Sequence, residues 1–157
     1  MRNSKTPTLK FFVLTRKSNM SKFQYDIRKF NKMYGLPVSD KPALVENTVE
    51  RLKNFKKILL EEIEEIEEII ESGPTASSLD ILTNLADLLG DIQVYCASEM
   101  QKFGLPIDDT LEIIMESNFS KLNPDGTATY DDRGKLLKGS NYWKPEPKLK
   151  ILLERSI

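Results

Sequence analysis

Hydrophobic residues recur every three or four positions along most of the chain, which is the spacing of helices with one apolar face. Ser21 and Gln24 form a capping-box pattern at the first helix start, and Gly35 and Gly104 are typical of helix ends. The pattern predicts four helices: Ser21 to about Tyr34, Pro42 to Glu71, Ser77 or Ser78 to Phe103, and Asp108 to about Leu122. Short connections between long amphipathic helices favour an antiparallel four-helix bundle.

The pattern changes after residue 122. Residues 123–126 (NPDG) are a strong turn sequence, and residues 127–130 (TATY) alternate like a strand. A second turn at residues 132–134 precedes Leu136 and Leu137. The predicted fold class is therefore all-α, an antiparallel four-helix bundle with a small C-terminal β-hairpin. The closing residues 144–157 (KPEPKLKILLERSI) are expected to dock as a short amphipathic tail.

The chain is expected to form one domain. Residues 1–19 are basic, and their apolar run of residues 11–14 is shorter than the ~7–15 residues of a signal-peptide core. We therefore expect residues 1–19 to be a loose extension and residues 20–157 to be a single helical domain that begins near Met20. No apolar run approaches the ~20 residues of a membrane span, so we expect no membrane partner and a cytoplasmic location.

Composition removes several kinds of chemistry. The chain has no His and a single Cys, Cys96, which excludes a Ser-His-Asp triad, His-ligated zinc and a Cys-x-x-Cys metal site. Lys and Arg total 23 against 24 Asp and Glu, so the net charge is −1 and no nucleic-acid partner is expected. Any chemistry must use carboxylates, Lys and Arg, hydroxyls and amides.

Seven glutamates crowd residues 61–71 (EEIEEIEEIIE), and a run of this kind is usually a solvated helix face. A helical wheel separates them, because Glu62 falls inside the apolar arc and Glu65 lies at its edge. A buried unpaired carboxylate costs several kcal/mol, so Glu62 needs a proton, a cation or a metal. The apolar arc itself contains Phe55, Leu59, Ile63, Ile66, Ile69 and Ile70.

The third predicted helix has a matching anomaly. Asp87 and Asp91 lie one turn apart on a helix that is otherwise apolar almost all round, although Asp is a poor residue for a helix interior. If the two helices pack antiparallel, Glu62 and Glu65 can meet Asp87 and Asp91. Such an all-oxygen cluster suits Mg²⁺ or Mn²⁺. The alternative is a solvent-facing polar strip with no ligand.

These residues resemble the all-α nucleoside triphosphate pyrophosphohydrolases, the MazG-like group that includes phosphoribosyl-ATP pyrophosphohydrolase and the dimeric dUTPases and dCTPases. The family motif is Glu-Glu-x-x-Glu followed by Glu-x-x-Asp, and residues 61–65 fit its first half. Residues 64–68 also fit, in a second register. Asp91 matches the motif Asp, but Leu88 stands at the usual Glu position, and Asp87 would take the place of that carboxylate. Residues 86–91 (ADLLGD) and 117–122 (SNFSKL) resemble the phage-type subgroup.

The resemblance implies Mg²⁺-dependent hydrolysis of a nucleoside triphosphate, with deoxynucleoside triphosphates favoured, to a monophosphate and pyrophosphate. It also implies a homodimer or homotetramer. Base selection is expected from the first helix and Asn118. The alternative is a structural helical bundle, or a metal- or nucleotide-binding protein without catalysis. The implied residues are Glu61 and Glu62 for catalysis, Glu62, Glu65, Asp87 and Asp91 for the metal, and Asn118, Lys121, Lys135 and Lys138 for the substrate.

Overall fold

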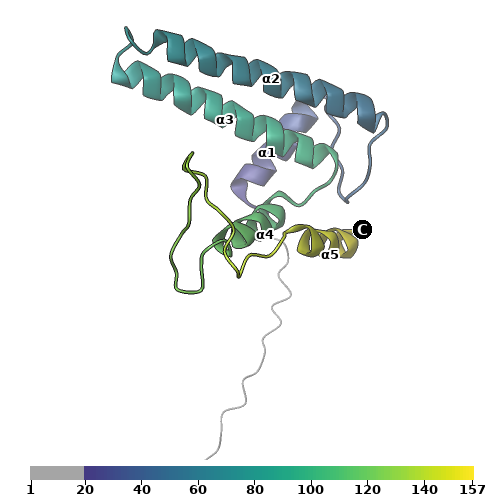
Figure 1. Cartoon of the computed structure of the whole chain (residues 1–157). Coiled ribbons are helices and arrows are strands. Elements are labelled where there is room, and N and C mark those ends of the chain that lie inside the picture. The colour runs from purple at the N-terminus through teal and green to yellow at the C-terminus, as the bar shows by residue number, and fades with distance from the viewer. Residues whose placement is uncertain (1–19) are drawn as a thin grey trace, which may run out of the picture.

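A computed structural model describes residues 20–157 of the chain. Helices α2 and α3 lie side by side as a long hairpin (Figure 1), and α3 also contacts α1 and α4, while α5 packs on α4. None of the helices in this part of the chain is long and apolar enough to span a membrane. The elements are α1 (Lys22–Met33), α2 (Thr48–Ser72), α3 (Ser78–Lys102), α4 (Ile107–Phe119) and α5 (Glu146–Ser156).

Side-chain caps fix two of the helix starts where the sequence predicts them. The Ser21 hydroxyl accepts a hydrogen bond from the Gln24 amide at 3.1 Å and donates one to Asp108 at 2.8 Å, which ties the start of α1 to α4. Ser77 and Asp80 form a complete capping box at the start of α3.

The predicted start of α2 at Pro42 is wrong. The helix begins at Thr48, because Asn47 adopts a left-handed conformation with φ of 56° that a helix cannot continue through. Residues before Asn47 form a connecting segment instead, and this segment hydrogen bonds to the end of α3 through the Ser39 and Ala43 amides.

The core lies where α1, the second half of α3 and the start of α4 meet. Ile27, Ala97 and Ile107 form its buried apolar centre. Beside them Asn31 is fully buried, and its side chain exchanges hydrogen bonds with Ser98, donating to the backbone carbonyl at 3.1 Å and accepting from the hydroxyl at 2.7 Å. This polar pair joins α1 to α3 inside the core.

The predicted C-terminal β-hairpin is wrong, since residues 20–157 contain no strand. The expected turn forms, with the Gly126 amide donating to Asn123 at 2.9 Å, but a single isolated bridge between Tyr130 and Leu136 is the extent of the pairing. Tyr130 is exposed and its bridge partner Leu136 is only half-buried, so the two segments bury little apolar surface. A two-stranded ribbon of this kind is marginal in water.

The predicted four-helix bundle is also wrong. The C-terminal tail forms a fifth helix, α5, which docks on α4 through an ion pair of 3.0 Å between Lys148 and Glu116. Helices α1 and α4 have 12 and 13 residues against 25 each in α2 and α3, so they cover only part of the hairpin. As a result Ile63, which the helical wheel places in the core, is 53% exposed.

Candidate functional site

Glu62 is the buried residue of the glutamate run. Its side chain is 7% exposed, and within residues 20–157 its Oε2 atom has no hydrogen-bond partner. Burial raises the pKa of Glu62, and the negative charges of Glu65, Asp91, Glu61 and Asp87 raise it further, in that order. A carboxylate in this position lacks the counter-charge that it needs when ionised.

The structure brings the predicted carboxylates to one seam between α2 and α3. Glu62 and Glu65 are nearly one turn apart on α2, and Asp87 and Asp91 are one turn apart on the antiparallel α3. Glu65, Asp87 and Asp91 are exposed, whereas Glu62 is buried. The charges of Glu65, Asp87 and Asp91 therefore act on Glu62, while the role of the four residues as metal ligands stays a prediction.

In residues 20–157, no three Asp, Glu or Cys side chains are already placed to hold a metal ion together. A shared cation would therefore require Glu65, Asp87 and Asp91 to rotate toward the free Oε2 of Glu62. Their exposure leaves room for this rotation, and the all-oxygen donor set is the one that Mg²⁺ and Mn²⁺ prefer.

Tyr95 belongs to the same seam and was missed by the sequence analysis. Burial raises the pKa of its hydroxyl, and the charges of Glu62, Asp91, Glu65 and Glu61 raise it further. Tyr95 follows Asp91 by four residues, so helical spacing could have placed it on the stripe with the aspartates. The phenol is held close to the carboxylates in its neutral form.

A pocket of about 350 Å³ lies beside the carboxylates, and part of its wall is Glu65 and Asp87. Ser72 and Asn84 add a hydroxyl and an amide to this wall, and Ile69 adds an apolar side chain. The carboxylate cluster therefore has space for a polar ligand at its side.

Among residues 20–157, the other residues predicted for catalysis and substrate binding do not bond to the carboxylates of the seam. Glu61 is exposed on α2, Asn118 is half-buried on α4 and Lys135 is exposed. Lys121 follows the end of α4, and the Lys138 Nζ atom lies 4.5 Å from the centre of the Tyr142 ring. In the described part of the chain, no hydrogen bond or ion pair joins the predicted substrate residues to the seam, so their roles stay predictions.

Comparison with known proteins gives a structural likeness only. No protein-family model and no curated protein matches the chain. Among 23 matching chains of solved structures is a "putative NTP pyrophosphohydrolase" from Exiguobacterium sp. 255-15. It is 18% identical, the match covers 87% of this chain and 96% of that chain, and the TM-score is 0.47. An identity and a TM-score this low do not establish a shared activity.

Proposed function

We propose that this protein is a Mg²⁺-dependent nucleoside triphosphate pyrophosphohydrolase that favours deoxynucleoside triphosphates. The observation that carries the proposal is Glu62, a buried carboxylate with a free oxygen atom and carboxylates from two helices around it. Like charges gathered in this way destabilise the ligand-free protein, and a divalent cation relieves their repulsion.

In this proposal Glu62, Glu65, Asp87 and Asp91 hold Mg²⁺, or Mn²⁺ in its place. Bound Mg²⁺ would neutralise phosphate charge and activate a water molecule for hydrolysis between the α- and β-phosphates. Glu61, at the exposed edge of the cluster, is assigned to accept a proton from that water. Lys121, Lys135 and Lys138 are assigned to balance the remaining phosphate charge as point cations, and Asn118 to contact the substrate.

The resemblance to the pyrophosphohydrolases favours triphosphate hydrolysis over metal or nucleotide binding without catalysis. Residues 61–65 fit the Glu-Glu-x-x-Glu motif of that family and Asp91 stands at the position of the motif Asp, with Asp87 in place of the usual Glu. The pocket beside Glu65 and Asp87 gives a phosphate chain access to the same carboxylates. A structural bundle would need neither the motif nor the buried glutamate.

The test is pyrophosphate release from ribo- and deoxynucleoside triphosphates, with Mg²⁺ and with a chelator, by the wild type, Glu62→Gln and Glu64→Gln. Glu64 is exposed on the same helix, so it is the matched control. We expect Mg²⁺-dependent pyrophosphate release that Glu62→Gln lowers by at least ~10²-fold and Glu64→Gln leaves nearly unchanged. Orthophosphate release would contradict the bond assignment, and no turnover of any triphosphate would favour the structural alternative.

We also propose that the working form is a homodimer or homotetramer. The apolar face of α2 that the chain leaves uncovered includes Ile63, Ile66 and Ile70, and α3 adds Leu82 and Leu89. Exposed apolar surface of this kind on a soluble helix pair commonly marks a contact with another chain. A second copy of the chain packed on this face would cover these side chains.

A further inference from the structure

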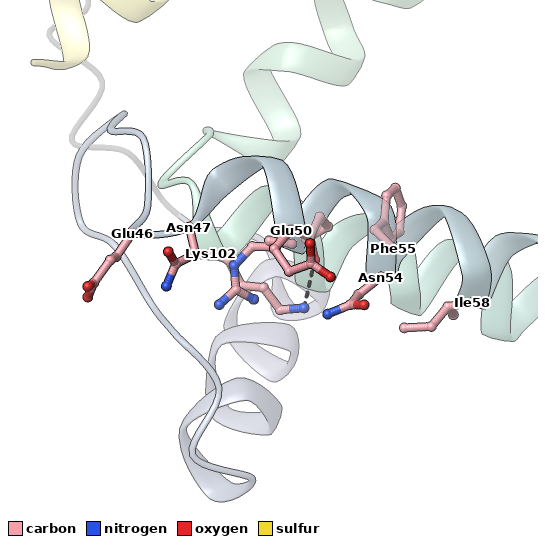
Figure 2. Close-up of a pocket in the computed structure, with 9 residues that line it drawn as sticks. Glu46, Asn47, Glu50, Asn54, Phe55, Ile58 and Lys102 are labelled. Atoms are coloured by element: carbon pink, nitrogen blue, oxygen red, sulfur yellow. Dashed lines mark hydrogen bonds and ion pairs between the residues drawn. The ribbon is translucent and has the colours of Figure 1, made fainter.

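A second pocket, of about 210 Å³, lies at the other end of the α2–α3 seam from Ser72 (Figure 2). It forms where α2 begins and α3 ends, so its walls come from both helices. The residues that matter for the argument are Arg51, Asn54, Phe55 and Ile58 from α2, and Glu99 and Lys102 from α3.

Two buried polar atoms at this pocket have no hydrogen-bond partner within residues 20–157. One is Oε1 of Glu99, a side chain that is 9% exposed and whose Oε2 accepts from the Lys102 ammonium at 2.6 Å. The other is Nε of Arg51, whose guanidinium has no ion pair in this part of the chain. Two residues that line the pocket therefore each keep one buried polar atom unpaired, an acceptor in Glu99 and a donor in Arg51, and unpaired buried groups of this kind are rare in proteins.

The pocket is lined by both acidic and basic side chains, which restricts the kind of ligand that it can bind. An inorganic anion would meet the carboxylates of Glu99 and Glu50, and a bare cation would meet Arg51 and Lys102. A flat ring with a donor and an acceptor on one edge satisfies Glu99 and Arg51 together, and the Phe55 ring and Ile58 provide apolar contacts for its face. Nucleobases have this shape and this edge chemistry.

The register along the seam connects this pocket to the carboxylates. Phe55, Ile58 and Glu62 follow one stripe of α2, and Glu99 follows Tyr95 and Asp91 on α3 at intervals of four residues. At 1.5 Å per residue, the distance along the axis from Phe55 to Glu62 is about 10 Å. A sugar lying along Ile58 and Tyr95 would connect a base at Glu99 to phosphates at Glu62.

We infer that the pocket formed by Arg51, Phe55 and Glu99 binds the nucleobase of the substrate, with Glu99 accepting from a ring or amino N–H and Arg51 donating to the base. The inference rests on the proposed function for the identity of the ligand. It moves base selection away from α1 and Asn118 to the α2–α3 seam. Neither free atom is reached by solvent, so binding requires a small rotation of Arg51 or Glu99.

The test measures binding of free nucleosides, which carry no phosphate, in the presence of a chelator. Cytidine, uridine, adenosine and guanosine are titrated into the wild type, Arg51→Gln and Glu99→Gln by calorimetry. The matched control is Lys53→Gln, because Lys53 is an exposed cation of α2 outside the pocket. We expect at least one nucleoside to bind, Arg51→Gln and Glu99→Gln to weaken its binding about tenfold or more, and Lys53→Gln to leave the binding unchanged.

Binding of no nucleoside, or binding that Arg51→Gln and Glu99→Gln leave intact, would overturn the inference while leaving pyrophosphate release possible. Nucleoside binding that both pocket variants lose, in a protein that hydrolyses no triphosphate, would support the pocket and overturn the catalytic proposal. Arg51 is only half-buried, so Arg51→Gln is expected to fold, and a circular dichroism spectrum with an unchanged melting temperature checks this.

Discussion

At the scale of single residues, helical periodicity predicted the burial of Glu62, and the structure confirms it. The same wheel placed Ile63 in the core, where the structure leaves it exposed, because periodicity does not say which neighbours cover a face. The free atoms of Arg51 and Glu99 could not be found in that way. Their lack of partners depends on how α2 and α3 align, which no local pattern encodes.

The raised pKa of Glu62 predicts how the metal-free protein responds to pH. Because the folded state holds this proton more tightly than the unfolded chain, where the ordinary value is 4.5, the Glu62 contribution makes unfolding easier as pH rises through the raised pKa. The groups that face it, Glu61, Glu65, Asp87, Asp91 and Tyr95, are acidic.

We therefore expect Glu62→Gln to match the wild type in free energy of unfolding below about pH 4.5, to exceed it increasingly as the pH rises from there to the raised pKa of Glu62, and to keep that advantage above it, with a chelator present. Urea unfolding at a series of pH values measures the difference. Glu64→Gln, on the exposed face, is the control and should show no such trend. A difference between Glu62→Gln and the wild type that stays constant with pH would contradict the burial argument.

The buried pair of Asn31 and Ser98 predicts a loss of stability when one partner is removed. Asn31→Ala leaves the Ser98 hydroxyl and the Pro37 carbonyl without their partner in the core. We expect a loss of about 1–3 kcal/mol in the free energy of unfolding, measured with urea. Asn141→Ala, at an exposed position, is expected to change it by less than about 0.5 kcal/mol.

At the scale of elements, the helices with side-chain caps were predicted well because a cap is a local interaction. Ser21 and Ser77 each act within three residues of sequence. The start of α2 was missed because it is set by the left-handed backbone conformation of Asn47. The Asn47 side chain makes no capping hydrogen bond that the sequence could have indicated. The hairpin was predicted from turn residues and alternation, yet strands also need a surface to cover them, which residues 127–137 do not find.

Gly104 shows how closely the α1–α2 connection approaches the end of α3. Its φ is +66°, and a Cβ atom there would lie 2.1 Å from the Lys41 carbonyl oxygen. Gly104→Ala is therefore expected to lose about 1–3 kcal/mol through backbone strain and a similar amount through the clash with Lys41.

Gly134→Ala is the matched control in the same urea measurement. Gly134 also has a positive φ, of +77°, but a Cβ atom there meets nothing within 4 Å. It should show the strain without the clash, so its loss of stability should be clearly smaller. Equal losses in the two variants would contradict the close approach.

At the scale of the whole molecule, the prediction of an antiparallel four-helix bundle was wrong, because the described residues form five helices of unequal length. Periodicity gives the width of an apolar face, and it does not say which chain covers it. Because α1 and α4 gather at one end of the α2–α3 hairpin (Figure 1), part of that face is left uncovered.

This uncovered face predicts self-association through α2. Ile63→Glu places a charge on the proposed interface, and we expect the variant to be monomeric at concentrations where the wild type is a dimer or tetramer. Size-exclusion chromatography with light scattering measures the mass. Leu44→Glu, at another exposed apolar position outside the hairpin, should leave the mass unchanged. A monomeric wild type would contradict the proposal.

The central claim is that the carboxylates between α2 and α3 bind a divalent cation, and the most direct test is calorimetric titration of Mn²⁺ into the metal-free protein. We predict saturable binding in the wild type and Glu64→Gln, and a loss of affinity of at least about tenfold in Glu62→Gln. Equal affinity in all three proteins, or no binding in any of them, would contradict the claim.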